Sequence, residues 1–216
     1  MVSVDPDNPV IKLCTEGMRA ETEGRPDDAR ALFEQAWDAA GDDYEACVAA
    51  HYLARHQPTP ELTLHWNRVC LTRADLVGDG RVKGFRTSLH LNMAKAHPDP
   101  DRAREHYTLA AAHLSDVPPG PYADATRMSI ADGFRSTGVT GPRPVEPLLV
   151  NLFTRLRALG DLKALALLLP VYLTDLGTEE DRLRLLAALG MVHAARWLPD
   201  DEQAILGQVI GALTQT

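Results

Sequence analysis

Eight histidines and three cysteines are the residues of this chain that could bind a metal ion. One helix presents two ligands to one ion from positions four apart. The histidine pairs are five or seven apart instead: His51 and His56, His90 and His97, His106 and His113. The cysteines, Cys14, Cys47 and Cys70, lack the close pairing of a zinc site or a secreted disulfide framework. This spacing predicts no metal site, surface or half-buried histidines, and reduced thiols in the core.

Adjacent carboxylates could serve in acid–base catalysis, but each pair stands where a helix is expected to begin. The pairs are Asp27-Asp28, Glu179-Glu180 and Asp200-Asp201. The positive end of a helix dipole explains such pairs without catalysis. The chain has no GxGxxG, Walker or GxSxG motif, and Gly78-Asp79-Gly80 is too short for a phosphate cradle. We therefore expect a protein that is not an enzyme and has no cofactor.

The charge balance excludes some partners. With 22 basic against 30 acidic residues, the net charge of −8 and the lack of a Lys/Arg run disfavour nucleic-acid binding. The longest apolar run, Ala164–Leu173, contains Pro170 and is too short to span a bilayer. The first nine residues lack the basic and apolar regions of a secretory signal. We expect a cytoplasmic protein that binds neither nucleic acid nor membrane.

Helical spacing is clearest in Gly24–Gly41. Its apolar residues recur at i, i+3, i+4 and i+7, namely Ala29, Leu32, Phe33, Ala36, Trp37 and Ala40. Pro26 suits the first turn, and Gly41 could close the helix in the left-handed conformation. Because Ala29 and Ala36 bracket Phe33, a partner helix could approach closely at the alanines. The segment before it supplies that partner, since Asn8-Pro9 is a cap followed by a first-turn proline.

This helical hairpin resembles the tetratricopeptide repeat (TPR) family. With a repeat starting at Val10, the small, turn, Ala, aromatic and Ala positions of the family pattern fall on Gly17, Gly24, Ala29, Phe33 and Ala36. Leu13, Glu16 and Ala20 depart from its usual residues. The resemblance implies a right-handed solenoid of helical hairpins.

The period supports this resemblance. Ala29 and Thr63 are 34 residues apart, as are Ala36 and Cys70, which is the family's period. In the second copy His51 replaces Gly17 and Asn67 replaces Phe33. A third copy has a first helix over Ser88–His97 and a second helix that begins at Asp99-Pro100. It repeats the Ala, aromatic, Ala spacing with Ala103, Tyr107 and Ala110. A fourth first helix is expected at Tyr122–Thr137.

Beyond the break at Gly138–Pro147 the repeats diverge. We expect helices over Pro147–Leu159, from Asp161 to about Leu176 with a kink or break at Pro170, from Thr178 through Trp197, and from Pro199 onward. The fold class is therefore all-α, with about eleven helices in a single TPR-like solenoid over 1–216. Its clearer repeats span 10–140, and 145–216 form divergent hairpins with a C-terminal capping helix.

In the family that this chain resembles, the first helix of each repeat lines a concave groove. Carrying the groove positions over gives a mixed polar stripe of Met18, Glu21, Tyr52, Arg55, Asn92, Lys95, Asp132 and Arg135, and the last six are the candidate binding residues. The resemblance implies that these residues lie on one face and bind a partner. The family's clamp for a terminal carboxylate is not expected, because Cys14 and Met18 stand at its Lys and Asn positions.

The resemblance implies a non-catalytic adaptor whose concave face binds another protein or a peptide. The two arginines and the lysine of the stripe would favour an acidic partner. The alternative is a regulator that senses a ligand or peptide in a pocket enclosed by the solenoid. An open channel favours the adaptor, and a closed apolar pocket favours the regulator. The sequence is compatible with a homodimer and does not fix the oligomeric state.

Overall fold

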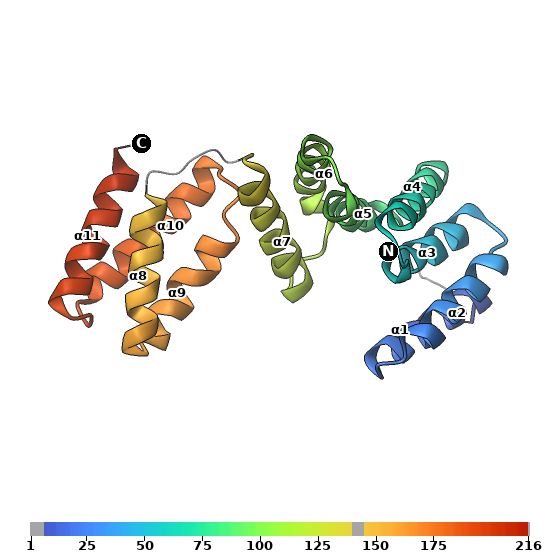
Figure 1. The fold of residues 1–216 in the computed structure, drawn as a ribbon, viewed down its shortest axis with the longest axis horizontal. Helices are drawn as coiled ribbons and strands as arrows, with labels where there is room; N and C mark the ends of the chain where they lie inside the picture. The colour runs from blue at the N-terminus through green and yellow to red at the C-terminus, as the bar shows by residue number, and fades with distance from the viewer. Residues whose placement is uncertain (1–6, 140–144, 216) are drawn as a thin grey trace. The chain divides into compact units, whose positions relative to one another are not determined.

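The computed structural model describes residues 7–139 and 145–215, and every regular element in these ranges is a helix (Figure 1). They contain eleven α-helices and two short 3₁₀ helices. The predicted all-α class is confirmed. Within these ranges, no helix combines the length and apolar character needed to cross a bilayer.

The chain divides into two compact units between Thr126 and Arg127, inside helix α7 (Pro121–Thr137). The N-terminal unit holds three helical hairpins: α1 (Pro9–Thr22) with α2 (Pro26–Asp38), α3 (Asp43–Leu53) with α4 (Pro60–Val77), and α5 (Lys83–Ala96) with α6 (Pro100–Ala112). The short helices η1 (Ala54–His56) and η2 (Leu114–Asp116) follow α3 and α6. Helices α2 and α3 pack together, as do α4 and α5, so the hairpins form a continuous stack.

The first hairpin forms as its sequence predicts. The Asn8 side chain accepts hydrogen bonds from the backbone N–H groups of Val10 and Ile11, which caps α1. Gly24 adopts a φ of 73°, the left-handed turn that favours glycine. A Cβ on Gly17 would lie 2.3 Å from the ring of Phe33, so the missing side chain is what admits the ring. Phe33 is fully buried, which makes this contact the centre of the hairpin.

Two details of the sequence interpretation are wrong in this unit. Gly41 does not close α2 with a positive φ, because Ala39 caps the helix in the right-handed region. Instead the Gly41 N–H donates to the Glu45 carboxylate at the start of α3, 2.7 Å away. Helix α5 also begins at Lys83, well before the expected Ser88, because it continues directly from the turn that the left-handed Gly78 opens after α4.

The C-terminal unit contains part of α7 and four further helices: α8 (Glu146–Leu159), α9 (Leu162–Leu173), α10 (Glu179–Ala195) and α11 (Asp200–Thr214). Three of the expected signals lie at the ends of these helices. Gly160 ends α8 with a φ of 68°, and the side chains of Asp161 and Thr178 cap α9 and α10. Helix α11 packs against both α10 and α8, so the four helices close around one leucine-rich core.

Two expected boundaries in this unit are wrong. Helix α9 passes through Pro170 and ends at Leu173, since Thr174 is its C-cap with a ψ of 5°, and the Thr174 carbonyl accepts a hydrogen bond from Arg127 instead (2.9 Å). Helix α10 ends at Ala195 because Arg196 takes the left-handed conformation, with a φ of 54°. Trp197 therefore lies outside the helix, where its indole N–H donates to Asp161 (3.0 Å).

Candidate functional site

Three of the six predicted binding residues, Arg55, Asn92 and Lys95, line one hollow of about 530 Å³ in the N-terminal unit. The hollow lies where the end of the second hairpin's first helix meets the last turns of α5. Its remaining lining residues are Ala54, Gln57, Pro58, Thr59, Pro60, Thr63 and Ala96. We call these ten residues the basic hollow, because its two ionisable side chains are cations.

The turn between α3 and α4 forms one wall of the basic hollow. After Leu53 the chain passes through η1, and the Gln57 amide donates to the Leu53 carbonyl (2.9 Å), which satisfies one of the carbonyls at the end of α3. The Thr59 hydroxyl then caps α4 by accepting from the N–H of Leu62 (3.3 Å), and Pro60 occupies the first turn. The N-terminus of an 18-residue helix thus borders the hollow and adds partial positive charge.

The opposite wall is the face of α5 that carries Asn92 and Lys95, three residues apart and so on the same side of the helix. Asn92 is half-buried and Lys95 is exposed. None of the ion pairs found among the described residues involves Lys95, and its ammonium charge is therefore available to an incoming group. A carboxylate could take the Lys95 ammonium and the Asn92 amide as donors.

Arg55 lies in the same hollow but is already paired. Its Nη2 donates to both carboxylate oxygens of Glu21, at 2.6 and 2.8 Å. His56 Nε2 contacts the same carboxylate at 2.5 Å. Glu21 belongs to α1, so this cluster joins the first and second hairpins. The positive charge of Arg55 is largely neutralised, and Lys95 is left as the cation that an anionic group would meet.

Tyr52 is beneath this cluster and does not line the hollow. The Arg55 guanidinium carbon lies 4.9 Å from the centroid of the Tyr52 ring, which in turn stacks on Phe33 at 5.2 Å. Burial raises the pKa of the Tyr52 phenol. Tyr52 therefore acts as an apolar platform that holds Arg55.

The other two predicted residues, Asp132 and Arg135, belong to the C-terminal unit. Asp132 is exposed, and its carboxylate lies 3.9 Å from Arg135 Nη2. The Arg135 guanidinium carbon is 5.6 Å from the centroid of the Tyr172 ring, and Nη1 is buried without a hydrogen bond. Arg55 and Lys95 belong to the N-terminal unit, and a face that they share with Asp132 and Arg135 stays a prediction.

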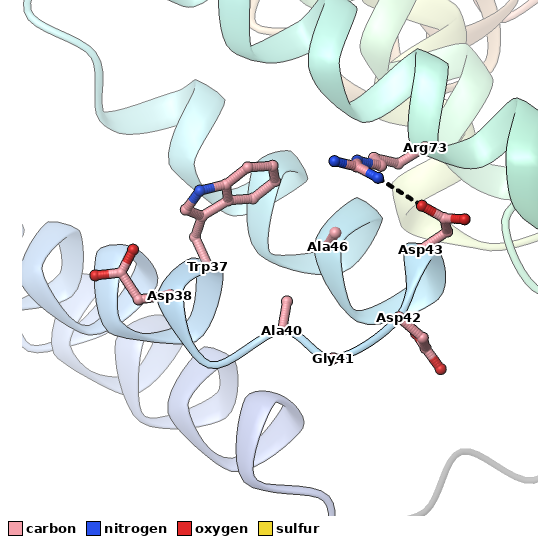
Figure 2. Close-up of a pocket in the computed structure, with 8 residues that line it drawn as sticks. All are labelled: Trp37, Asp38, Ala40, Gly41, Asp42, Asp43, Ala46 and Arg73. Carbon is pink, nitrogen blue, oxygen red and sulfur yellow. Dashed lines mark hydrogen bonds and ion pairs between the residues drawn. The ribbon is translucent and has the colours of Figure 1, made fainter.

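A second hollow, of about 520 Å³, lies between the end of α2 and the start of α3 (Figure 2). It is lined by Trp37, Asp38, Ala40, Gly41, Asp42, Asp43, Ala46 and Arg73. Figure 2 shows Trp37 on one side and the pair of Arg73 with Asp43 (2.7 Å) on the other, with the carboxylates of Asp38 and Asp42 directed away from both. These carboxylates do not converge, and the arrangement offers no site for a cation.

The histidines differ from their expected exposure. His51 and His90 are only 8% and 6% exposed, so the prediction of surface or half-buried positions is wrong for these two. His90 Nδ1 lies 3.2 Å from His106 Nδ1 of the next helix, a contact that spacing along one helix could not indicate. In residues 7–139 and 145–215, no three His, Cys, Asp or Glu side chains are grouped so as to hold a metal ion.

The cysteines are buried and unbridged, as predicted. The Sγ atoms of Cys47 and Cys70 lie 3.5 Å apart between α3 and α4. Burial raises the pKa of the Cys14 thiol to about 12. Such thiols are poor nucleophiles, since the thiolate is the reactive form.

No protein-family model, curated protein or solved structure matches this chain.

Proposed function

We propose that the chain is a non-catalytic adaptor of the TPR type, whose basic hollow binds an acidic segment of a partner protein. The observation that carries the proposal is the meeting of Arg55, Asn92 and Lys95 in one hollow. They come from two hairpins and are 40 residues apart at the extremes, yet they line the same surface. An anionic group would meet a cation without an intramolecular partner in an otherwise acidic protein.

The stacked hairpins support this choice over an enclosed sensor pocket. The basic hollow is open to solvent and mixes polar groups with the apolar surfaces of Ala54, Pro58, Pro60 and Ala96. Prolines and alanines contact a peptide with little loss of side-chain entropy, and the polar groups fix its orientation. The buried free thiols are compatible with action in the reducing cytoplasm.

Charge reversal at Lys95 tests the proposal. Binding of fluorescein-labelled peptides of eight glutamates, eight lysines or eight serines is measured by fluorescence anisotropy at low salt. We expect the glutamate peptide to bind preferentially and Lys95→Glu to weaken it by about tenfold, equivalent to ~1.4 kcal/mol. Added salt should weaken the wild-type complex, because exposed charges are screened.

Lys83→Glu is the matched control, since Lys83 is also exposed and lies at the other end of the same helix. It changes the net charge equally but is outside the basic hollow. Equal weakening by both variants would mean that only net charge matters. That result, or equal binding of all three peptides, would refute the proposed site.

A further inference from the structure

Four imidazole rings form a row along the seam between α5 and α6. Successive ring centroids are separated by 6.0 Å from His113 to His90, 5.4 Å from His90 to His106, and 6.2 Å from His106 to His97. The row runs from the end of α6 to the end of α5, because the two helices are antiparallel. The adaptor function proposed above makes no use of it.

The central pair has the geometry of a nitrogen-to-nitrogen hydrogen bond. The Nδ1 atoms of His90 and His106 are 3.2 Å apart, and the two ring planes are inclined by only 24°. A neutral imidazole has one N–H group and one acceptor nitrogen. One ring must therefore donate from Nδ1 while the other accepts, and a single proton lies between the two atoms. If both rings were protonated, two N–H groups would face each other and the bond would be lost.

The surroundings disfavour that second proton. Burial, followed by the charges of His106, His113 and Arg86, lowers the pKa of His90 to about 4, with Asp75 acting in the opposite direction.

The pKa of His106 is also lowered, chiefly by burial. The charged groups around it are His97, Arg68 and Arg102, which lower it further, and Glu105, which raises it. Arg68 is in α4, Arg102 and Glu105 are in α6, and His97 directly follows α5. Both rings of the pair are therefore neutral in the folded protein near pH 7, where the single-proton bond is intact.

We propose that His90 and His106 form a pH-sensitive latch that holds α5 against α6 near neutral pH and releases the seam in acid. The unfolded histidine takes up a proton below its ordinary pKa of about 6.5, whereas folded His90 resists protonation until about pH 4. Lowering the pH from about 6.5 to about 4 therefore shifts the equilibrium from the closed seam toward opened states. Above pH 6.5 neither state is protonated, and the latch is insensitive to pH.

The same helix carries Asn92 and Lys95 of the basic hollow. A released seam would disturb that wall, so acid would weaken partner binding. This consequence rests on the proposed function, whereas the latch itself does not.

The proton uptake on unfolding measures the latch directly. Urea unfolding between pH 7 and pH 4.5 gives the number of protons taken up, from the slope of unfolding free energy against pH. We expect His90→Leu, which keeps an apolar side chain in the buried position, to lower this number by about one. His65→Gln is the control, because His65 is exposed on α4 and outside the row. Equal slopes in both variants would overturn the proposal.

Two further measurements separate a latch from a general acid effect. In ¹⁵N NMR of the imidazoles, we expect His90 to titrate near pH 4 and His106 below its ordinary pKa, and we expect His106→Gln to change the His90 titration. In hydrogen exchange, amides of α5 and α6 should lose protection at a higher pH than those of α10 and α11. Independent titration near pH 6.5, or simultaneous loss of protection in all four helices, would each refute the latch.

The consequence for the hollow has its own outcome. If the glutamate peptide binds at pH 7, its affinity should fall toward pH 5 more in wild type than in His90→Leu. If that peptide fails to bind at pH 7 while the proton uptake and NMR results hold, the proposed function fails and the latch stands.

Discussion

The first two hairpins have equivalent positions 34 residues apart and fill them in opposite ways. In α1–α2 the equivalent residues are Gly17 and Phe33, and the ring occupies the place where a side chain of Gly17 would be. In α3–α4 they are His51 and Asn67, both buried. His51 Nδ1 and Asn67 Oδ1 are buried without hydrogen-bond partners. One hairpin is joined by an apolar interlock, while the other keeps two unpaired polar atoms.

The two hairpins therefore share the same residue spacing but are not stabilised by the same interactions. A buried polar atom without a partner costs about 1–3 kcal/mol, whereas a buried aromatic ring contributes through its contacts. The second hairpin still packs, because Trp66 reaches Trp37 of the first hairpin with 4.9 Å between ring centroids, and His51 packs on Phe85 of α5 at 4.7 Å. Its stability thus depends more on its neighbours.

The largest expected effect is at Phe33. Phe33→Ala should destabilise the protein by about 3–5 kcal/mol, the usual cost of deleting a buried aromatic side chain. Asn67→Ala at the equivalent position should cost less than ~1 kcal/mol, because it also removes the unpaired Oδ1. Urea unfolding followed by circular dichroism measures both.

The contrast between the two variants is the sensitive quantity. Equal losses would mean that the two hairpins are held together in the same way and that the glycine–aromatic interlock is unimportant. An unchanged melting temperature for Phe33→Ala would contradict the packing itself.

His51 gives a second, pH-dependent contrast. His51→Leu should stabilise the protein by about 1 kcal/mol at pH 7, because the unpaired Nδ1 is removed. Burial, reinforced by Arg55, lowers the pKa of His51 to about 4. The wild type therefore loses stability as pH falls below 6.5, and at pH 5 the advantage of the variant should grow by roughly 2 kcal/mol.

Unfolding at pH 7 and pH 5 measures this growth, with exposed His65→Gln as the control. A constant difference between the two pH values would show that His51 titrates normally in the folded chain.

Local sequence signals predicted most of the fold, because they act over one helical turn. Asn8, Asp161 and Thr178 cap helices where expected, and Gly24, Gly78 and Gly160 adopt positive φ. Two of the failures involve contacts between helices. The Thr174 carbonyl after α9 accepts a hydrogen bond from Arg127 of α7, and Glu45 of the next helix takes the N–H of Gly41.

The candidate site was predictable only in part. The repeat phase placed Arg55, Asn92 and Lys95 on one side of the hairpins, and the structure brings them into one hollow. The repeat phase also places Glu21 and Arg55 at equivalent positions, but it does not fix how two long side chains meet, so the sequence interpretation missed that Glu21 neutralises Arg55. Nor could the repeat phase indicate the contact between His90 and His106, which are 16 residues apart and belong to different helices.

The smallest expected effect concerns how the first two hairpins are joined. Glu21 and Arg55 are equivalent residues of the two repeats, and their ion pair is the polar counterpart of the stacking between Phe33 and Tyr52. Their side chains are 25% and 37% exposed, so solvent screens the attraction and the pair should contribute about 0–1 kcal/mol.

A double-mutant cycle of Glu21→Gln and Arg55→Gln isolates this coupling, and the exposed pair of Arg30 and Glu34 within α2 is the reference. We expect both cycles to give similar small values that decline with salt. His56 also contacts Glu21, so the cycle is repeated with His56→Gln to remove that contribution. A coupling above about 2 kcal/mol would mean that the ion pair, and not the stacking of Phe33 on Tyr52, holds the two hairpins together. In that case, freeing Arg55 for an acidic partner would loosen the stack, and the hollow would have to bind its ligand through Lys95 and Asn92.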